Sequence, residues 1–379
     1  MLQLEVPLGS PKPTKISGSY HFTDNDINLG RNIPMLMAVN GDLLFTESTL
    51  LTRNVSAKVL GGPTTILAQM DADGAVRVKA SGKAVLGEIR STAPHPLLLY
   101  LQGGTPWQAE ITGLKKQVAI VVTSDLVGLS SRLPRPFSKA AAESIPLRLE
   151  RKTLPGQHDL LTVKYGNVLG AKILRDEKNG IFQIKRGLVS LGSQGAWPNQ
   201  DGLWITGTVP EFSLNGWGPL MGPSEGSPLI SRGGVDLRIK KVSGYGYKMD
   251  DVRIMARTRN NLMVAQVSSD ALAGEVRWQS YGNGKLTARL KNLLLDKDEH
   301  DQTDKDSSIV PAPAAENSEA VKGFPALDVV VDTVTLNGKH LGKLELQGQQ
   351  QGQDWRMENL LLLIAQYLGT QHIAIFNGQ

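Results

Sequence analysis

The chain has 379 residues, enough for two domains or for one elongated domain. Its 40 glycines and its aromatic content of only 5% favour many short strands over a helical core. The net charge of +5 is mild and the basic residues are spread along the chain, which favours a solvated sheet face over a nucleic-acid surface, and the absence of cysteine excludes disulfides and thiolate chemistry.

The amino-terminal part of the chain consists of short segments in which apolar and polar residues alternate. Residues 55–59 and 76–80 show this pattern, and a period of two places their apolar side chains on one face of a strand. Turn signals that contain glycine separate such segments at 40–42 and 73–74. The pattern predicts a meander of antiparallel hairpins.

Residues 124–146 interrupt the alternation. Ser124 or Asp125 can cap a short helix that carries leucines at spacings of three and four residues, and Pro134 and Pro136 would end it. The sequence therefore predicts a short helical insertion near 124–146 that lies on the sheet or at its edge.

The most regular alternation lies between residues 233 and 295, after a loop predicted at 218–234 from its Gly, Pro and Ser content. Two predicted strands there each place apolar side chains on one face and charged side chains on the other. The candidate lining residues of this apolar face are Val235, Leu237, Ile239, Val252 and Ile254. An ordinary sandwich core is an equally good interpretation of the same five residues.

The chain then changes character. Residues 296–323 combine dense charge with a low-complexity Pro-Ala run and cannot bury a core, so we expect a disordered linker or loop. Alternation resumes in residues 324–379, which we interpret as a continuation of the sheet.

No motif in the sequence predicts an enzyme, and we expect neither a metal nor a cofactor. Asp296, Asp298 and His300 stand at alternate positions, but a calcium loop also needs a turn glycine and a distant glutamate, which are absent here. The histidines are too far apart in sequence for a zinc site. The glycine pairs at 61–62 and 103–104 lack the features of phosphate loops, so a turn or bulge is the better interpretation. A triad assembled from distant residues stays open, although no motif favours it.

The tryptophans stand near the ends of predicted strands or in turns. They are Trp107, Trp197, Trp204, Trp217, Trp278 and Trp355. Such rings could stack single-stranded nucleic acid beside a basic groove. Because the basic residues do not cluster, we interpret the tryptophans as anchors at the corners of the sheet and expect no nucleic-acid partner.

Several phrases, in order and spacing, resemble one known family over nearly the whole chain. They are the Gly-x-Leu-x-Phe-x-Glu at 41–47, the Gly-Gly turn at 60–63, the segments 124–129 and 133–139, the Gly-x-x-x-x-Gly-x-x-Pro at 202–210 with Trp217, and 324–329 with 341–344 and Trp355. In these phrases the chain resembles the YhdP family, AsmA-like envelope proteins of Gram-negative bacteria related to TamB.

The resemblance implies a mainly β fold, an elongated, twisted antiparallel sheet that forms an open, taco-like groove over residues 1–295 with a few short helices. The concave face would carry phospholipid acyl chains between the inner and outer membranes. It also implies a periplasmic location, tethered to the inner membrane, with envelope proteins of both membranes as partners. Family members are much longer and begin with a membrane helix. We therefore expect a central to carboxyl-terminal fragment, without membrane helix or signal peptide, whose end from Met357 is truncated or shifted in frame.

Two functions follow from these expectations. In the first, the chain conducts phospholipids along an apolar groove, where each buried methylene contributes about 0.8 kcal/mol. In the second, it is a structural periplasmic scaffold that supports outer-membrane assembly or permeability and binds proteins through open sheet edges, without lipid transport of its own. The discriminating observation is whether the alternating apolar residues pack against protein or face an open trough.

Overall fold

The computed structural model describes most of the chain. The described residues are 2–5, 15–30, 33–92, 95–115, 117–156, 158–178, 181–217, 232–297, 325–352, 354–364 and 372–376. Strands dominate these residues, with short helices between them, so the predicted mainly β fold class is confirmed. The chain forms two compact units, with a division near Ile184. The sequence-based division into a groove region over residues 1–295, a linker and a further repeat stays a prediction.

Unit 1 consists of Met1–Leu133 and Ser138–Ile184. Its strands are β1 (Leu2–Glu5), β2 (Lys15–Ile27), β3 (Leu36–Thr46), β4 (Leu50–Val59), β5 (Gly62–Met70), β6 (Val76–Val85), β7 (Leu101–Leu114), β8 (Gln117–Ser124), β9 (Leu129–Ser131), β10 (Leu147–Leu154), β11 (His158–Tyr165) and β12 (Leu169–Lys178). The α-helix α1 (Leu86–Thr92) and the 3-10 helix η1 (Pro96–Tyr100) connect β6 to β7. Successive strands pair antiparallel, apart from β9, which lies on the start of β7 while β8 pairs with β10. The predicted meander of hairpins is therefore confirmed for this unit.

Unit 2 consists of Pro134–Phe137 and Lys185–Gln379. Its strands are β13 (Ile181–Leu191), which spans the division between the units, β14 (Gly202–Ser213), β15 (Arg232–Gly244), β16 (Tyr247–Arg259), β17 (Leu262–Ser268), β18 (Leu272–Gln279), β19 (Lys285–Lys297), β20 (Ala326–Leu336), β21 (Lys339–Gln351), β22 (Asp354–Ile364) and β23 (His372–Phe376). The short helix α2 (Leu214–Trp217) follows β14.

The sheet of unit 2 is mixed, which corrects the prediction of an antiparallel sheet. β13 pairs with β14, β14 with β15, and β19 with β20 in parallel. A parallel pair cannot be joined by a tight hairpin, so each needs a longer connection. The connections are residues 192–201, 214–231 and 298–325. The predicted linker at 296–323 falls on the last connection and lies outside the described residues, except that Asp296 and Lys297 end β19.

The predicted helical insertion at 124–146 is wrong. This segment contains turns, β9 and a bridge between Ser131 and Lys139, and no helix. The Oγ of Ser124 accepts the backbone N–H of Leu126 at 3.0 Å, and Oδ1 of Asp125 accepts that of residue 127 at 3.1 Å. The side chains predicted to cap a helix therefore close turns instead, a competing use of the same residue types. Leu126 also has a positive φ of 56°, which a right-handed helix does not allow.

The sequence from Met357 departs from the pattern expected for a strand, yet the structure forms a strand there. β22 runs through this residue to Ile364 and pairs with β21 on one side and β23 on the other. Residues 360–364 of this strand are four leucines and an isoleucine. The pairing makes this run a strand of the sheet, as the alternating segments before it are.

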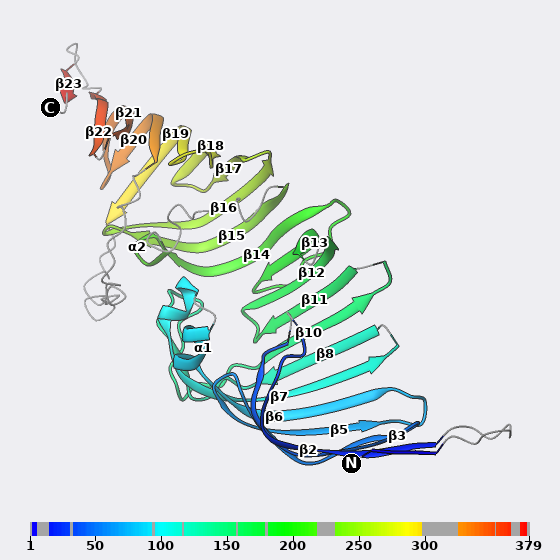
Figure 1. Ribbon diagram of the computed structural model, residues 1–379. Helices are drawn as coiled ribbons and strands as arrows, with labels where there is room; N and C mark the ends of the chain where they lie inside the picture. The colour runs from blue at the N-terminus through cyan, green and yellow to red at the C-terminus, as the bar shows by residue number, and fades with distance from the viewer. Residues whose placement is uncertain are drawn as a thin grey trace. The chain divides into compact units, whose positions relative to one another are not determined.

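Each unit is a single layer of strands (Figure 1). Among the described elements, the strands of each unit follow one another in one hydrogen-bonded sheet. The buried apolar residues of unit 1 form a cluster on this layer, and Ile89 of α1 packs against it. The main cluster of unit 1 consists of Val39, Val55, Ala57, Val59, Ile66, Ala84, Trp107 and Ala109.

Candidate functional site

The five candidate lining residues lie together on β15 and β16. Leu237 stands opposite Ile254, and Ile239 stands opposite Val252, so these side chains share one face of the sheet. Val235 lies on the same face, two residues before Leu237 on β15. Ile239 is 5% exposed and Val252 is 3% exposed, whereas the other three are half-buried. The structure therefore brings all five into one patch, and their contact with lipid stays a prediction.

The patch extends over the whole sheet of unit 2. The cross-strand register places two parallel rows of side chains on this face, from β14 to β22. The first row is Ile205, Val235, Ala256, Ala265, Val276, Ala288, Val329, Leu346 and Leu360, and the second is Gly207, Leu237, Ile254, Val267, Gly274, Leu290, Val331, Leu344 and Leu362. Every member of the two rows is apolar or glycine, and we call them the unit 2 apolar face.

In the part of the chain that the structure describes, the strands of unit 2 belong to one hydrogen-bonded sheet, which Figure 1 shows as a single layer. A sandwich would place the strands of a second sheet about 10 Å above it. The interpretation of the five residues as a sandwich core and their interpretation as a lining both stay predictions. The short helix α2 contacts β14 and β15.

Unit 1 carries an apolar face of the same design, which the sequence analysis did not single out. One row of side chains crosses the sheet without a break in register from β5 to β12. It consists of Ile66, Ala80, Ala109, Val122, Leu149, Val163 and Ala171. We call this row and its same-face neighbours the unit 1 apolar face. The alternation at 76–80 was the signal that could have located it.

A charged cluster stands at one border of the unit 1 apolar face. On β10 Arg151 follows Leu149 in phase, and on β11 Asp159 precedes Leu161 in phase. Arg175 on β12 lies opposite Asp159. The three side chains therefore share the face of the leucines, at the end of the apolar rows.

The geometry of the cluster is that of a carboxylate held by two guanidinium groups. Arg175 donates from Nε to Oδ1 of Asp159 at 2.8 Å and from Nη2 to Oδ2 at 2.7 Å, which is a bidentate pair. Arg151 donates from Nε to Oδ2 at 2.7 Å. The ring of Phe182 lies against both, 4.4 Å from the Cζ of Arg175 and 5.3 Å from that of Arg151. Asp159 itself is 2% exposed.

The environment of Asp159 keeps it ionised. Burial raises the pKa of this carboxyl, and the hydrogen bonds from Arg175 and Arg151 together lower it by more, so the pKa lies below its ordinary value. A buried carboxylate between two cations satisfies its hydrogen-bonding capacity. The cluster as a whole carries one more positive than negative charge.

A cavity of about 720 Å³ lies in unit 1 beside Trp107. Its lining is Ser81, Gly82, Pro106, Trp107, Gln108, Thr123, Ser124, Asp125, Pro146, Leu147, Arg148, Lys164 and Gly166. The side chain of Trp107 is buried, and its indole N–H has no hydrogen-bond partner in the described part of the chain. A lining that joins ring surface to polar groups can accommodate part of an amphiphilic molecule.

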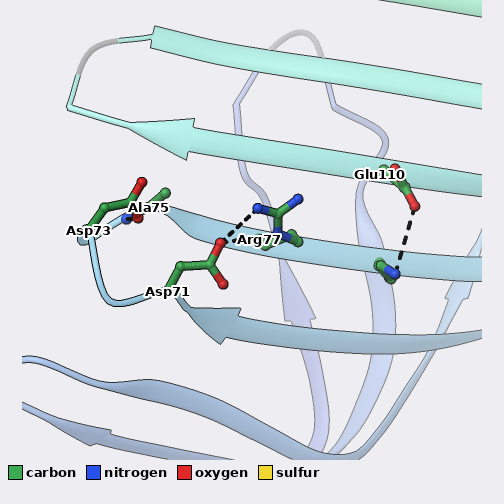
Figure 2. A network of polar contacts seen from close by, with 6 residues as sticks. Asp71, Asp73, Ala75, Arg77 and Glu110 are labelled. Carbon is green, nitrogen blue, oxygen red and sulfur yellow. Dashed lines mark hydrogen bonds and ion pairs between the residues drawn. The ribbon is translucent and has the colours of Figure 1, made fainter.

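The opposite face of unit 1 carries paired charges. Nη2 of Arg77 donates to Oδ2 of Asp71 at 2.7 Å, and Nζ of Lys79 lies 3.9 Å from Oε1 of Glu110. Figure 2 shows this network beside the turn between β5 and β6. Along β6, Arg77 and Lys79 on this face alternate with Val76, Val78 and Ala80 on the other face. The two faces of the layer therefore differ in chemistry as the alternation predicts.

Three tryptophans act as anchors of loops. The indole N–H groups of Trp204, Trp217 and Trp355 donate to backbone carbonyls. The acceptors are Gln200, Arg135 and Pro325, at 3.2, 3.2 and 3.0 Å. Each acceptor lies outside a strand. The arrangement agrees with the interpretation of these rings as anchors at the corners of the sheet.

The glycine pairs at 61–62 and 103–104 are explained by the conformation of the backbone. Residues 60–61 form the turn between β4 and β5, with Gly61 at a φ of 80°. Gly103 has a φ of 91°, and a Cβ there would lie 2.2 Å from the carbonyl oxygen of Gly128. Both pairs are thus explained by a turn and by a close approach of two backbone segments.

Within the described ranges, no group of three or more His, Asp and Glu side chains is arranged to hold a metal ion. Asp298 and His300 of the calcium candidate lie outside these ranges. None of the described helices has the length and apolar character needed to cross a membrane.

Comparisons with known proteins bear on the family. Neither the curated proteins nor the solved structures gave a match. The family model described as "YhdP protein" matches residues 1–371, which is nearly the whole chain. This agrees with the resemblance carried by the phrases from 41–47 to Trp355. The chain therefore belongs to the YhdP family, a family of non-enzymatic, AsmA-like envelope proteins.

Proposed function

We propose that this chain is a segment of an envelope-spanning lipid transfer protein, and that phospholipid acyl chains move along its apolar faces between the inner and outer membranes. The observation that carries the proposal is the unit 2 apolar face. Its two rows cross nine strands without one polar side chain, and the nine strands belong to one hydrogen-bonded sheet. Such a surface in water needs an apolar occupant.

The chemistry of acyl chains suits this surface. Each methylene that leaves water contributes about 0.8 kcal/mol, independently of its position along the face. Because the rows hold no polar side chain that would fix one register, a chain can shift from strand to strand at small cost. Transport in this form requires no catalytic residue, and the proposal places the protein in the periplasm with envelope proteins of the two membranes as partners.

The test is native mass spectrometry of the purified chain, with extraction of lipid from the same sample. We expect co-purifying phospholipid in the parent chain and its loss in Leu237→Asp and in Ile254→Asp. Met255→Asp is the matched control, because Met255 is the neighbour of Ile254 on β16, faces the other side and is 44% exposed. Circular dichroism checks that each variant keeps its strands.

A folded chain that carries no lipid would contradict the proposal. In that case the scaffold function is favoured, in which the chain supports outer-membrane assembly or permeability through protein contacts. Equal loss of lipid in Met255→Asp would show that the effect does not come from the apolar face.

A further inference from the structure

The charged cluster borders apolar surface in the way that the headgroup of an amphiphile borders its chains. The residues on the apolar side of the cluster in the same phase are Leu147 and Leu149 on β10, Leu161 and Val163 on β11, and Ala171 and Ile173 on β12. All of them are half-buried, so they keep accessible apolar surface. Beyond these rows, on the same face and on the same three strands, stand Arg151, Asp159 and Arg175.

The cluster has an excess of cation over anion. Asp159 neutralises one of the two guanidinium groups, so the three-residue cluster is left with one positive charge at the border of the apolar rows. The second arginine leaves the site complementary to an anion.

Donors remain for such an anion. Arg151 uses only Nε toward Asp159, and in the described residues neither of its Nη groups donates to another protein atom. Arg175 uses Nε and Nη2 toward Asp159, so in the described residues its Nη1 likewise donates to no other protein atom. The two arginine side chains are 21% and 22% exposed, so a ligand can reach them. A guanidinium edge offers parallel N–H groups at the spacing of phosphate oxygens.

The two arginines are also held in place before any ligand arrives. Asp159 fixes one edge of each guanidinium, and Phe182 lies against both groups. A site whose donors are already ordered loses less conformational entropy on binding.

We propose that Arg151 and Arg175 bind the phosphate of an amphiphile whose hydrocarbon chains lie on the neighbouring leucines of the unit 1 apolar face. The inference rests on the proposed function and adds to it a headgroup site and a preference for phosphate-bearing lipids. Asp159 and Phe182 are positioning residues, because they orient the guanidinium groups. The shared chemistry is a phosphate oxyanion, which a lipid or a free phosphate ion could supply.

The test measures, by titration calorimetry, the affinity of three probes for the full 379-residue chain. They are dihexanoyl phosphatidylglycerol, dihexanoylglycerol with the same chains and no phosphate, and inorganic phosphate. We expect the phospholipid to bind about tenfold more tightly than the diacylglycerol, which corresponds to one charge-assisted interaction. Inorganic phosphate, which gains nothing from the apolar face, should bind more weakly than the phospholipid.

Arg151→Gln is the variant of choice, because Arg175 retains its bidentate pair with Asp159 and the sheet stays paired. We expect it to reduce phospholipid affinity about tenfold, to the level of the diacylglycerol, with diacylglycerol affinity unchanged. Lys152→Gln is the matched control, since Lys152 lies on the same strand, also carries one positive charge, and its side chain is 54% exposed on the other face. It should change neither affinity.

The outcomes separate the two proposals. If neither lipid binds the folded chain, the proposed function fails. If both lipids bind equally and Arg151→Gln changes neither, the headgroup site is wrong while lipid binding stands. If inorganic phosphate binds as tightly as the phospholipid, the site belongs to a free anion and the amphiphile is excluded.

Discussion

Asp159 shows how a charged residue can be part of an apolar face. It is almost fully buried, and its two oxygens accept three hydrogen bonds from Arg151 and Arg175. Removing one member of a buried pair leaves the others without compensation, and this costs more than the pair contributes. The residue is therefore expected to matter for stability as well as for the orientation of the arginines.

Replacement of this carboxylate tests that expectation. Asp159→Asn should lower the free energy of unfolding at neutral pH by about 3–5 kcal/mol, because the guanidinium groups lose their counter-charge. Urea denaturation followed by circular dichroism measures it. Asp125→Asn is a suitable control, since the Asp125 side chain accepts a backbone N–H in an exposed turn. A loss no larger than that of the control would contradict the buried-pair description.

The same carboxylate predicts a pH dependence. Because the pKa of Asp159 is lower in the folded chain than in the unfolded chain, its stabilisation is complete above its ordinary value near about 4. It is lost as the pH falls from there through the lowered value of the folded chain. The difference in unfolding free energy between the parent chain and Asp159→Asn should therefore be constant near neutral pH and shrink below about pH 4. A difference that grew on acidification would have the wrong sign.

At the scale of the elements, the strands β13 and β14 show how parallel pairing is accommodated in unit 2. Gly207 lies in the middle of β14 with a φ of 133°, and a Cβ there would lie 2.0 Å from the carbonyl oxygen of Leu191 on β13. The parallel neighbour thus approaches closely at a position that only glycine tolerates. The connection at residues 192–201 lets β14 run parallel to β13, and Gly207 allows the two backbones to approach each other.

Substitution of this glycine should weaken the β13–β14 pair. We expect Gly207→Ala to destabilise the chain by about 1–3 kcal/mol, from strain and from displacement of the neighbouring backbone. Gly113→Ala is the matched control, because Gly113 also lies within a strand, β7, and a Cβ there would meet nothing within 4 Å. Thermal unfolding of the two variants side by side measures the difference. Equal melting temperatures would show that the backbone adjusts without cost.

At the scale of the whole molecule, the two units repeat one design. Each is a single layer with an apolar face of small and branched side chains and an opposite face of paired charges. A single layer of this design exposes more contiguous apolar surface than a closed sandwich of the same length. That difference can be measured without knowledge of the natural ligand.

A hydrophobic fluorescent dye provides the measurement. The delipidated, folded chain should bind such a dye at room temperature, and added short-chain phospholipid should displace it, because both occupy the apolar faces. Leu237→Asp should reduce dye binding more than Met255→Asp does. A molten state also binds such dyes, so a cooperative thermal transition must be shown for the same sample. A cooperatively folded chain that binds no dye would contradict the open faces.

Local pattern predicted the faces of the strands well and the turns less well. The period of two located Val235, Leu237 and Ile239 on one face, because neighbouring side chains in a strand must point to opposite sides. The same reasoning failed at Ser124 and Asp125, because these residue types cap helices and close turns with the same hydrogen bonds. The charged cluster was missed, although the phase of Arg151 with Leu147 and Leu149 was visible in the sequence.

The sequence by itself determined that this protein is a mainly β chain whose strands alternate apolar and polar side chains, and its phrases determined the family. Both are properties of residue order, since alternation and turn residues act within a few positions along the chain. Only the tertiary structure decided that three strand pairs are parallel, that the described sheets form single layers, and that Arg151, Asp159 and Arg175 meet. These depend on which strands become neighbours, because pairing brings together residues that no local pattern connects.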